Sequence, residues 1–119
     1  MNNYSDFAKE LKTKILSLPQ DKYEEFLAEL VSFYIEPGYD EMVLNLTDKN
    51  RLSLIRFIVL LNTKFKQAGK ATTLVKISND TIDSEFGFVL KNGENEIDCS
   101  AEKLLSEKID TVTEILLKL

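Results

Sequence analysis

Residues 42–77 read MVLNLTDKNRLSLIRFIVLLNTKFKQAGKATTLVKI, and this stretch decides the fold. It opens with a short apolar run over residues 42–46, which has the length of a strand. A longer apolar stretch follows that is typical of a helix, with Gly69 placed to end it. Residues 72–77 are rich in alternating β-branched side chains and predict a second strand. If both strands share a sheet, the unit is a right-handed parallel crossover.

The apolar side chains of the crossover helix are spread around its axis. Thr47-Asp48 suit an N-cap and a first-turn acid, so they predict where the helix begins. Because a helix that is apolar on nearly all sides is normally surrounded by other elements, we expect it to be central in the fold. The residues that line it are Leu52, Ile55, Phe57, Ile58, Val59, Leu61 and Phe65.

Two helices are predicted before this unit. Apolar residues at spacings of four and three mark one face of the first helix. Ser17 with Gln20 three residues later is a capping-box pattern for the second, and Pro19 fits its first turn. The second helix should stop before Pro37-Gly38. The two apolar faces consist of Phe7, Leu11, Ile15 and Leu18, and of Tyr23, Phe26, Leu27, Leu30, Val31 and Tyr34.

A hairpin and a final helix are predicted after the unit. Alternate residues from Phe86 to Leu90 are apolar, and Asn92-Gly93 is a strong tight-turn signal before a strand over residues 96–99. Ser100 can cap a last helix whose apolar residues repeat at spacings of four and three. Those residues are Leu105, Ile109, Val112, Leu116 and Leu119.

The order of these elements predicts an α+β fold. Two N-terminal helices precede a β-α-β-β-β-α arrangement with one four-stranded mixed sheet that helices cover. We expect residues 1–17 to form an N-terminal helix and residues 18–119 a globular docking domain. A chain of 119 residues is long enough to bury the core of one such domain.

The composition excludes several classes of function. The formal net charge is −5, and no Lys/Arg cluster of the kind that neutralises phosphates is visible, so no nucleic-acid partner is expected. No apolar stretch reaches the roughly 18 residues of a membrane-spanning helix, so no direct membrane insertion is expected. The sequence has no histidine, which excludes Ser-His and Cys-His nucleophile pairs and the commonest metal ligand.

Two acidic clusters and one cysteine remain as candidates for chemistry. The first cluster lacks the central glycine and the bidentate glutamate of a calcium loop, so an exposed loop is expected. The second surrounds a turn, which offers no pocket to shift a pKa, so a charged strand edge is expected. We interpret Cys99 as a small buried apolar residue, and we expect no catalytic, cofactor or metal site. The clusters are Asp80, Asp83 and Glu85, and Glu94, Glu96 and Asp98.

Several short motifs, taken together, resemble a known family. Residues 18–23 read LPQDKY and lead into a helix, and later the strand 87–90 reads GFVL before Asn92-Gly93, Ile97-Asp98 and a closing amphipathic helix. This order resembles the C-terminal domain of the E subunit of V-type and archaeal-type (A-type) ATPases over essentially the whole chain. The chain departs from the family at residues 85–87, where members often have a glycine pair. It also departs at residues 102–105, where a basic-leucine step is common.

The resemblance implies a structural function without catalysis. The E subunit belongs to the peripheral stalk, a stator that holds the head of the ATP synthase or ATPase against rotor torque during proton or sodium transport. The implied partners are the second peripheral-stalk subunit (G/H type) and the N-terminal region of the nucleotide-binding B subunit of the head. The implied location is cytoplasmic and peripheral to the membrane. Because members of the family normally begin with a long helix, we expect this chain to be either the globular end of a longer protein, which is the preferred interpretation, or a shortened relative.

Seven apolar residues are predicted to border the contact with the stalk partner, because their spacing is that of a helix lying against another helix. The simpler interpretation is that each stripe packs on the sheet of its own domain. The alternatives to a stator are a small acidic ligand-binding or enzymatic α+β domain unrelated to ATPases, and a free-standing adaptor. The seven residues are Phe7, Leu11, Ile15, Leu105, Ile109, Val112 and Leu116.

Overall fold

The parallel crossover forms as the sequence predicts. The computed structural model describes residues 5–70 and 75–119. In it, β1 (Glu41–Asn45) pairs in parallel with β2 (Lys76–Ile82). The predicted second strand therefore begins later and extends further than expected, and its residues 72–74 lie outside the described residues.

The connection between β1 and β2 contains two helices where one was predicted. These are α3 (Leu46–Arg51) and α4 (Leu54–Gln67), and the two residues between them are extended. The predicted cap at Thr47 is wrong. The side chain of Asn45 accepts a hydrogen bond of 2.9 Å from the backbone N–H of Asp48, so the helix begins directly at the end of β1.

The remaining strands complete the predicted mixed sheet. β3 (Gly87–Asn92) and β4 (Asn95–Ser100) form the antiparallel hairpin, with Gly93 in its turn. β3 also pairs with β1 in the antiparallel sense, and the strand order is β2-β1-β3-β4. The two strands at the edges of the sheet are therefore β2 and β4.

The N-terminal helices are α1 (Asp6–Leu16) and α2 (Gln20–Tyr34). The predicted capping box at the start of α2 is wrong, because Ser17 belongs to the end of α1. Its hydroxyl donates a hydrogen bond of 2.7 Å to the carbonyl of Thr13. Pro19 occupies the N-cap position of α2, and no side chain caps that helix.

The C-terminal helical segment is also divided in two. α5 (Ala101–Ser106) and α6 (Ile109–Leu117) replace the single predicted helix. Ser100 occupies the N-cap position of α5 as expected, but its hydroxyl makes no capping bond. Instead, the hydroxyl of Ser84 accepts a hydrogen bond of 3.0 Å from the backbone N–H at the start of α5. The cap comes from a residue far away in the sequence, which no local pattern could indicate.

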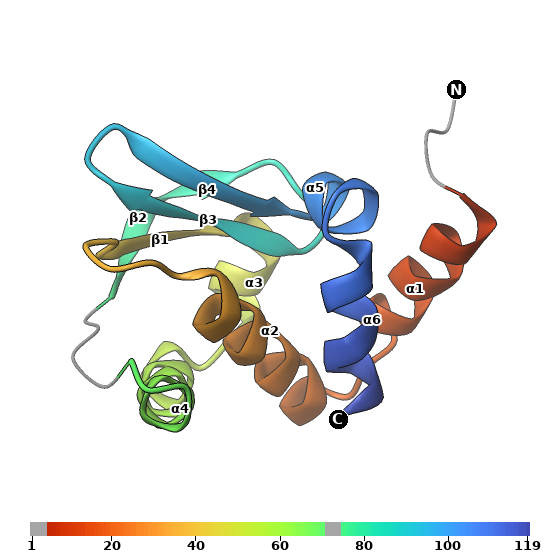
Figure 1. The fold of residues 1–119 in the computed structure, drawn as a ribbon, viewed down its shortest axis with the longest axis horizontal. Coiled ribbons are helices and arrows are strands. Elements are labelled where there is room, and N and C mark those ends of the chain that lie inside the picture. Colours follow the sequence, from red (N-terminus) through yellow and green to blue (C-terminus); the bar gives the residue numbers. More distant parts are fainter. Residues whose placement is uncertain (1–4, 71–74) are drawn as a thin grey trace.

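Helices gather on one side of the sheet and around one of its ends (Figure 1). Alternate strand residues such as Met42, Leu44, Phe88 and Leu90 are fully buried on the covered face. Ala8, Leu11 and Ile15 of α1 join the same continuous core, so α1 packs into the domain. The largest buried side chains include Phe26, Phe57, Phe65, Phe86 and Phe88.

The expectation that the long crossover helix lies at the centre of the fold is wrong. One face of α4 is buried, through Phe57, Leu61 and Phe65. The opposite face is solvent-exposed: Ile55 is 84% exposed and Val59 61%. Figure 1 shows the reason, because α4 lies at the margin of the molecule, beside α2 and distant from α1, α5 and α6. The sequence carries apolar residues on a face that no described element covers.

Candidate functional site: two apolar docking surfaces

The structure brings the seven predicted partner-binding residues to one end of the molecule. Three come from α1, one from α5 and three from α6, and these helices lie together in Figure 1. Leu11, Ile15, Leu105 and Val112 are buried in the core of the domain itself, where they support this end from beneath. Phe7 is 51% exposed, while Ile109 and Leu116 are half-buried. Only these last three reach the surface.

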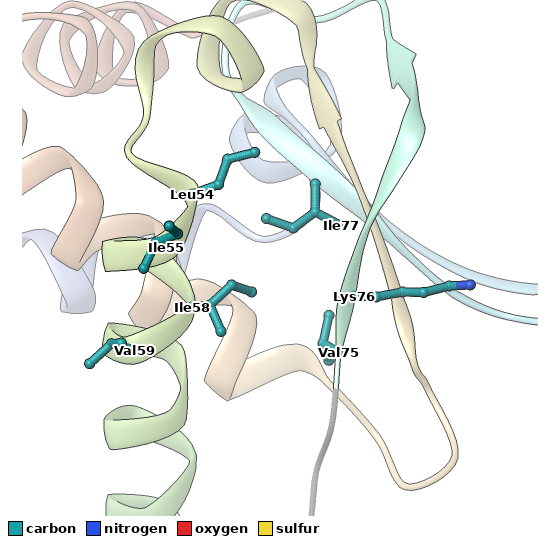
Figure 2. A pocket seen from close by; sticks show the side chains of 7 residues that line it. All are labelled: Leu54, Ile55, Ile58, Val59, Val75, Lys76 and Ile77. Carbon is teal, nitrogen blue, oxygen red and sulfur yellow. The ribbon is translucent and has the colours of Figure 1, made fainter.

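A second apolar surface lies between α4 and β2. It is an open groove of about 480 Å³, lined by Leu54, Ile55, Ile58, Val59, Val75, Lys76 and Ile77. Figure 2 shows the side chains of Leu54 and Ile58 turned toward that of Ile77, whereas Lys76 points away from the groove. The groove exists because α4 packs on α2 and leaves a gap beside the edge strand of the sheet. We call this surface the α4/β2 groove.

Sequence reasoning missed the α4/β2 groove, although the signal was present. Apolar residues on nearly all sides of the crossover helix predict that the whole helix is buried within the fold, which conceals an exposed apolar face. A monomeric chain seldom leaves adjacent large apolar side chains exposed unless they bind something, so exposure of Ile55 and Val59 marks a candidate docking surface.

The first acidic cluster forms no metal site. Asp80 lies within β2 and not in the predicted loop, because that strand runs on to Ile82. All three acids of the cluster are exposed, and Glu85 pairs with Lys12 at 2.5 Å. Within the described ranges, no three Asp, Glu or Cys side chains are grouped so that they could hold a metal ion.

The second acidic cluster lies on the hairpin and edge strand, as predicted. Glu94 is in the turn, and Glu96 and Asp98 are on β4. Glu96 lies 3.6 Å from the ammonium of Lys91 on β3, and Asp98 accepts a hydrogen bond of 2.9 Å from the backbone N–H of Ser100. These carboxylates are engaged with strand neighbours, which suits a charged sheet edge.

The prediction that Cys99 is a buried apolar residue is confirmed. Its side chain is fully buried in the core cluster. Burial raises the pKa of the thiol to about 12, with a smaller opposing effect from Lys108. The thiol is therefore neutral near pH 7 and unreactive.

A buried polar cluster joins α2, the end of β1 and α3. The hydroxyl of Tyr23 donates to the carboxylate of Asp48, and the side-chain amide of Asn45 donates to the same oxygen at 2.8 Å. That amide also donates to the carbonyl of Gly87 at 3.0 Å, and the guanidinium of Arg51 lies 4.9 Å from the centre of the Tyr23 ring. Tyr23, Asn45 and Asp48 are all buried, and only Arg51 of this cluster is exposed to solvent.

The charge of Asp48 makes the stability of the protein depend on pH. Burial raises the pKa of Asp48 above its ordinary value of about 4, although hydrogen bonds from Tyr23 and Asn45 and the charge of Arg51 oppose this. The folded protein thus holds this proton more tightly than the unfolded chain does. The resulting stabilisation is present below about pH 4 and is lost as pH rises through the folded-state pKa.

We therefore predict that Asp48→Asn becomes progressively more stable relative to wild type as pH rises from about 4 to 7. The amide oxygen can accept both hydrogen bonds that Asp48 accepts on one oxygen, and it stays neutral. Urea unfolding of both proteins across this pH range measures the difference in unfolding free energy. A difference that stays constant or falls with pH would contradict the prediction.

No helix within the described parts of the chain is long and apolar enough to cross a bilayer.

Comparison with known proteins identifies relatives among the components of rotary ATPases. The chain is 34% identical over 105 residues to the E subunit of the V-type ATP synthase of Acetivibrio thermocellus, and 35% identical over 106 residues to that of Clostridium botulinum strain Langeland. The E subunit of the V-type proton ATPase of Thermoanaerobacter pseudethanolicus is 26% identical over 103 residues. No family model matches the chain. No solved structure matches it either.

The resemblance to the E subunit inferred from short motifs is confirmed by these homologues. The first two matches cover 88% of this chain and 52% of each relative. The chain therefore spans about half the length of the curated relatives it matches, which is consistent with a single domain of that subunit.

Proposed function

We propose that this chain is the globular, head-docking domain of the E subunit in the peripheral stalk of a V-type ATP synthase or ATPase, and that it works as a non-catalytic stator component. The observation that carries the proposal is its 34–35% identity to V-type E subunits over 88% of the chain. In this function the domain transmits force between the stalk and the catalytic head while the rotor turns during proton or sodium transport. It works on the cytoplasmic face, peripheral to the membrane.

The packing of the domain suits a part that bears load. α1, α2, α4, α5 and α6 all contribute to one continuous core with the covered face of the sheet. Closely packed protein interiors resist compression and transmit strain, which a stator needs. The guanidinium of Arg56 on α4 donates to both oxygens of Glu24 on α2, from Nη2 at 2.7 Å and from Nε at 3.1 Å, and this bidentate pair ties α4 to α2.

The surface of the domain favours docking over small-molecule chemistry. An enzyme or ligand-binding domain would be favoured by a deep cavity lined with carboxylates of shifted pKa. Burial raises the pKa of the Asp48 carboxyl, but this group is buried among α2, β1 and α3 and does not line an open cavity. The exposed surfaces instead offer large apolar side chains on α1 and α4.

The proposed partners are the second peripheral-stalk subunit (G/H type) and the N-terminal region of the nucleotide-binding B subunit of the head. We assign the stalk partner to the end of the molecule formed by α1 and α6, because Phe7, Ile109 and Leu116 reach the surface there. The buried members of the predicted set hold these helices in place. The apolar face of a partner helix can pack against exposed aromatic and branched aliphatic side chains of this kind.

The test is binding of this domain to the purified stalk partner, measured by calorimetry. We predict that Phe7→Asp and Leu116→Asp each weaken binding at least about tenfold, which corresponds to roughly 1.4 kcal/mol. Ile55→Asp is the matched control, since Ile55 is also a large apolar side chain and is even more exposed, but lies on α4. It should leave the affinity for the stalk partner unchanged.

Two results would contradict the proposal. If the wild-type domain bound neither of the two proposed partners, the proposed stator function would be contradicted. Binding to the stalk partner that Phe7→Asp and Leu116→Asp leave intact, but that Ile55→Asp abolishes, would keep the function and move the contact to α4.

A further inference from the structure

The α4/β2 groove is built from a long stretch of the chain in which every charged residue is basic. Residues 49–79 contain seven Lys and Arg residues and no Asp or Glu. The rest of the chain holds the other eight basic residues and all 20 acidic residues. α4 and the described start of β2 both come from this basic stretch, in a protein whose net charge is −5. The basic residues are Lys49, Arg51, Arg56, Lys64, Lys66, Lys70 and Lys76.

Only two of these seven cations are paired with carboxylates in the described part of the chain. Arg56 binds Glu24, and Lys64 lies 2.7 Å from Glu29, so both are neutralised by acids of α2. The other five have no carboxylate within 4.0 Å among the described residues. No acid within residues 49–79 offsets this positive charge, although the ammonium groups of Lys49 and Lys70 donate hydrogen bonds to backbone carbonyls.

Apolar and cationic side chains follow one another along the exposed face of α4. Ile55, Val59 and Lys66 are separated by four and seven residues, so at about 100° per residue they lie within roughly 40° of one another around the helix axis. All three are exposed. A segment that lay along this face would meet apolar side chains beside the groove and a free ammonium group beyond them.

The backbone beside the groove is poorly suited to accept an added strand. β2 bulges there, because Met42 pairs with Ile77 and Leu44 pairs with Thr81, which leaves three residues of β2 opposite one of β1. Within the bulge, the ammonium of Lys49 donates hydrogen bonds to the carbonyls of Ser78 and Asn79, at 2.9 Å and 2.6 Å. An occupant must therefore bind through side chains, as a helix in a groove does.

From this geometry we propose that the α4/β2 groove is a docking site for an acidic amphipathic helix of another protein. The apolar face of that helix fills the groove against Ile55, Ile58 and Val59, and its carboxylates face the ammonium of Lys66 on α4 and the other basic residues of this stretch. The inference does not depend on the proposed function, because it rests on the exposed apolar face and the local charge alone. It concerns the end of the molecule away from α1 and α6 (Figure 1).

The chemistry of the groove favours a protein occupant over a nucleic acid. None of its seven lining residues is aromatic, so it offers no platform on which bases could stack. Its lining is apolar apart from Lys76, which points outward in Figure 2. Cations around an apolar groove match a helix with leucines on one face and glutamates on the other.

The test uses the full 119-residue chain and a pair of synthetic helical peptides. Both peptides carry leucines at positions i, i+3, i+4 and i+7, with glutamates elsewhere in one and lysines elsewhere in the other. Fluorescence anisotropy should show that the glutamate peptide binds with a Kd below about 100 μM and at least about tenfold more tightly than the lysine peptide. Added salt should weaken the binding of the glutamate peptide.

Variants locate the binding site. Ile55→Asp should weaken binding of the glutamate peptide at least about tenfold, and Lys66→Glu should weaken it severalfold with a smaller salt dependence. The matched control is Phe33→Asp, since Phe33 is 60% exposed on α2 and is not among the groove residues. It should leave the affinity unchanged, and circular dichroism confirms that each variant is folded.

Four results would overturn the inference. These are equal or tighter binding of the lysine peptide, no binding of the glutamate peptide at about 1 mM, loss of binding in Phe33→Asp but not in Ile55→Asp, and tighter binding of a DNA oligonucleotide than of the peptide. Sedimentation supplies a fifth: a dimer of this chain that Ile55→Asp dissociates would identify a second copy as the occupant. None of these results bears on binding of the stalk partner, so the two proposals fail separately.

Discussion

Gly87→Ala should destabilise the protein by at least about 3 kcal/mol. Gly87 begins β3 with a φ of 92°, a conformation that residues with a Cβ rarely adopt. A Cβ at this position would overlap the carbonyl oxygen of Cys99 on β4 and come within 3.1 Å of the Cα of Ser100. Both neighbours are backbone atoms of the adjacent strand, so they cannot turn aside as a side chain would. The strands must separate at the end where α5 begins.

Chemical unfolding of Gly87→Ala and Gly69→Ala separates the steric overlap from the cost of the backbone conformation. Gly69, after α4, has a φ of 75°, and a Cβ there would meet nothing within 4 Å. Gly69→Ala should therefore cost only the conformational strain, about 1 kcal/mol. Equal destabilisation by the two substitutions would show that the strands at Gly87 move apart without cost.

Asn45→Ala should destabilise the protein by about 3 kcal/mol, through several losses at one buried position. The side chain caps α3 by accepting from the N–H of Asp48, and its amide donates to the carboxylate of Asp48 and to the carbonyl of Gly87. Asn45 is fully buried, so water cannot replace these bonds without rearrangement. Without the Asn45 amide, the Asp48 carboxylate and the Gly87 carbonyl each lose one hydrogen bond that they accept in the native protein.

The matched control is Thr47→Ala, at the position where the sequence predicted the cap. Thr47 is exposed in the first turn of α3, so its substitution should change the unfolding free energy by less than about 0.5 kcal/mol. Urea unfolding of both variants measures the contrast. A larger effect at Thr47 than at Asn45 would show that the helix begins later than the structure places it.

Because Asn45 binds the carbonyl of Gly87, the effects of these two substitutions should not add. The double variant should lose less stability than the sum of the single losses, since displacement of β3 already breaks the shared hydrogen bond. Strict additivity would mean that Gly87→Ala leaves the contact between β1 and β3 unchanged.

Local patterns were sufficient for the elements and for part of the topology. The apolar run of β1, the β-branched residues in the stretch 72–77 and the glycine after α4 predict a parallel crossover, because the right-handed connection leaves one arrangement for such a unit. Asn92-Gly93 similarly predicts the hairpin of β3 and β4. The short motifs of residues 18–23 and 87–90 were also enough to indicate the E subunit of V-type ATPases, which the homologues confirm.

Helix ends and caps were predicted less well, because the groups that decide them come from elsewhere in the fold. Ser17 fits a capping box in the sequence, yet it ends α1. The start of α5 is capped by Ser84, which lies 17 residues earlier in the chain. The single helices predicted for the crossover and for the C-terminal segment are each divided in two, into α3 and α4 and into α5 and α6.

The sequence by itself determined which residues are apolar, which segments are helices or strands, and how β1 and β2 are connected, since periodicity and turn chemistry are local properties of the chain. Only the tertiary structure decided which apolar faces are covered. Leu11, Ile15, Leu105 and Val112 are buried because α1, α5 and α6 pack together at one end, whereas Ile55 and Val59 are exposed because the sheet ends at β2 beside α4. Burial depends on whether another element lies opposite a face, and hydrophobic periodicity carries no information about that neighbour.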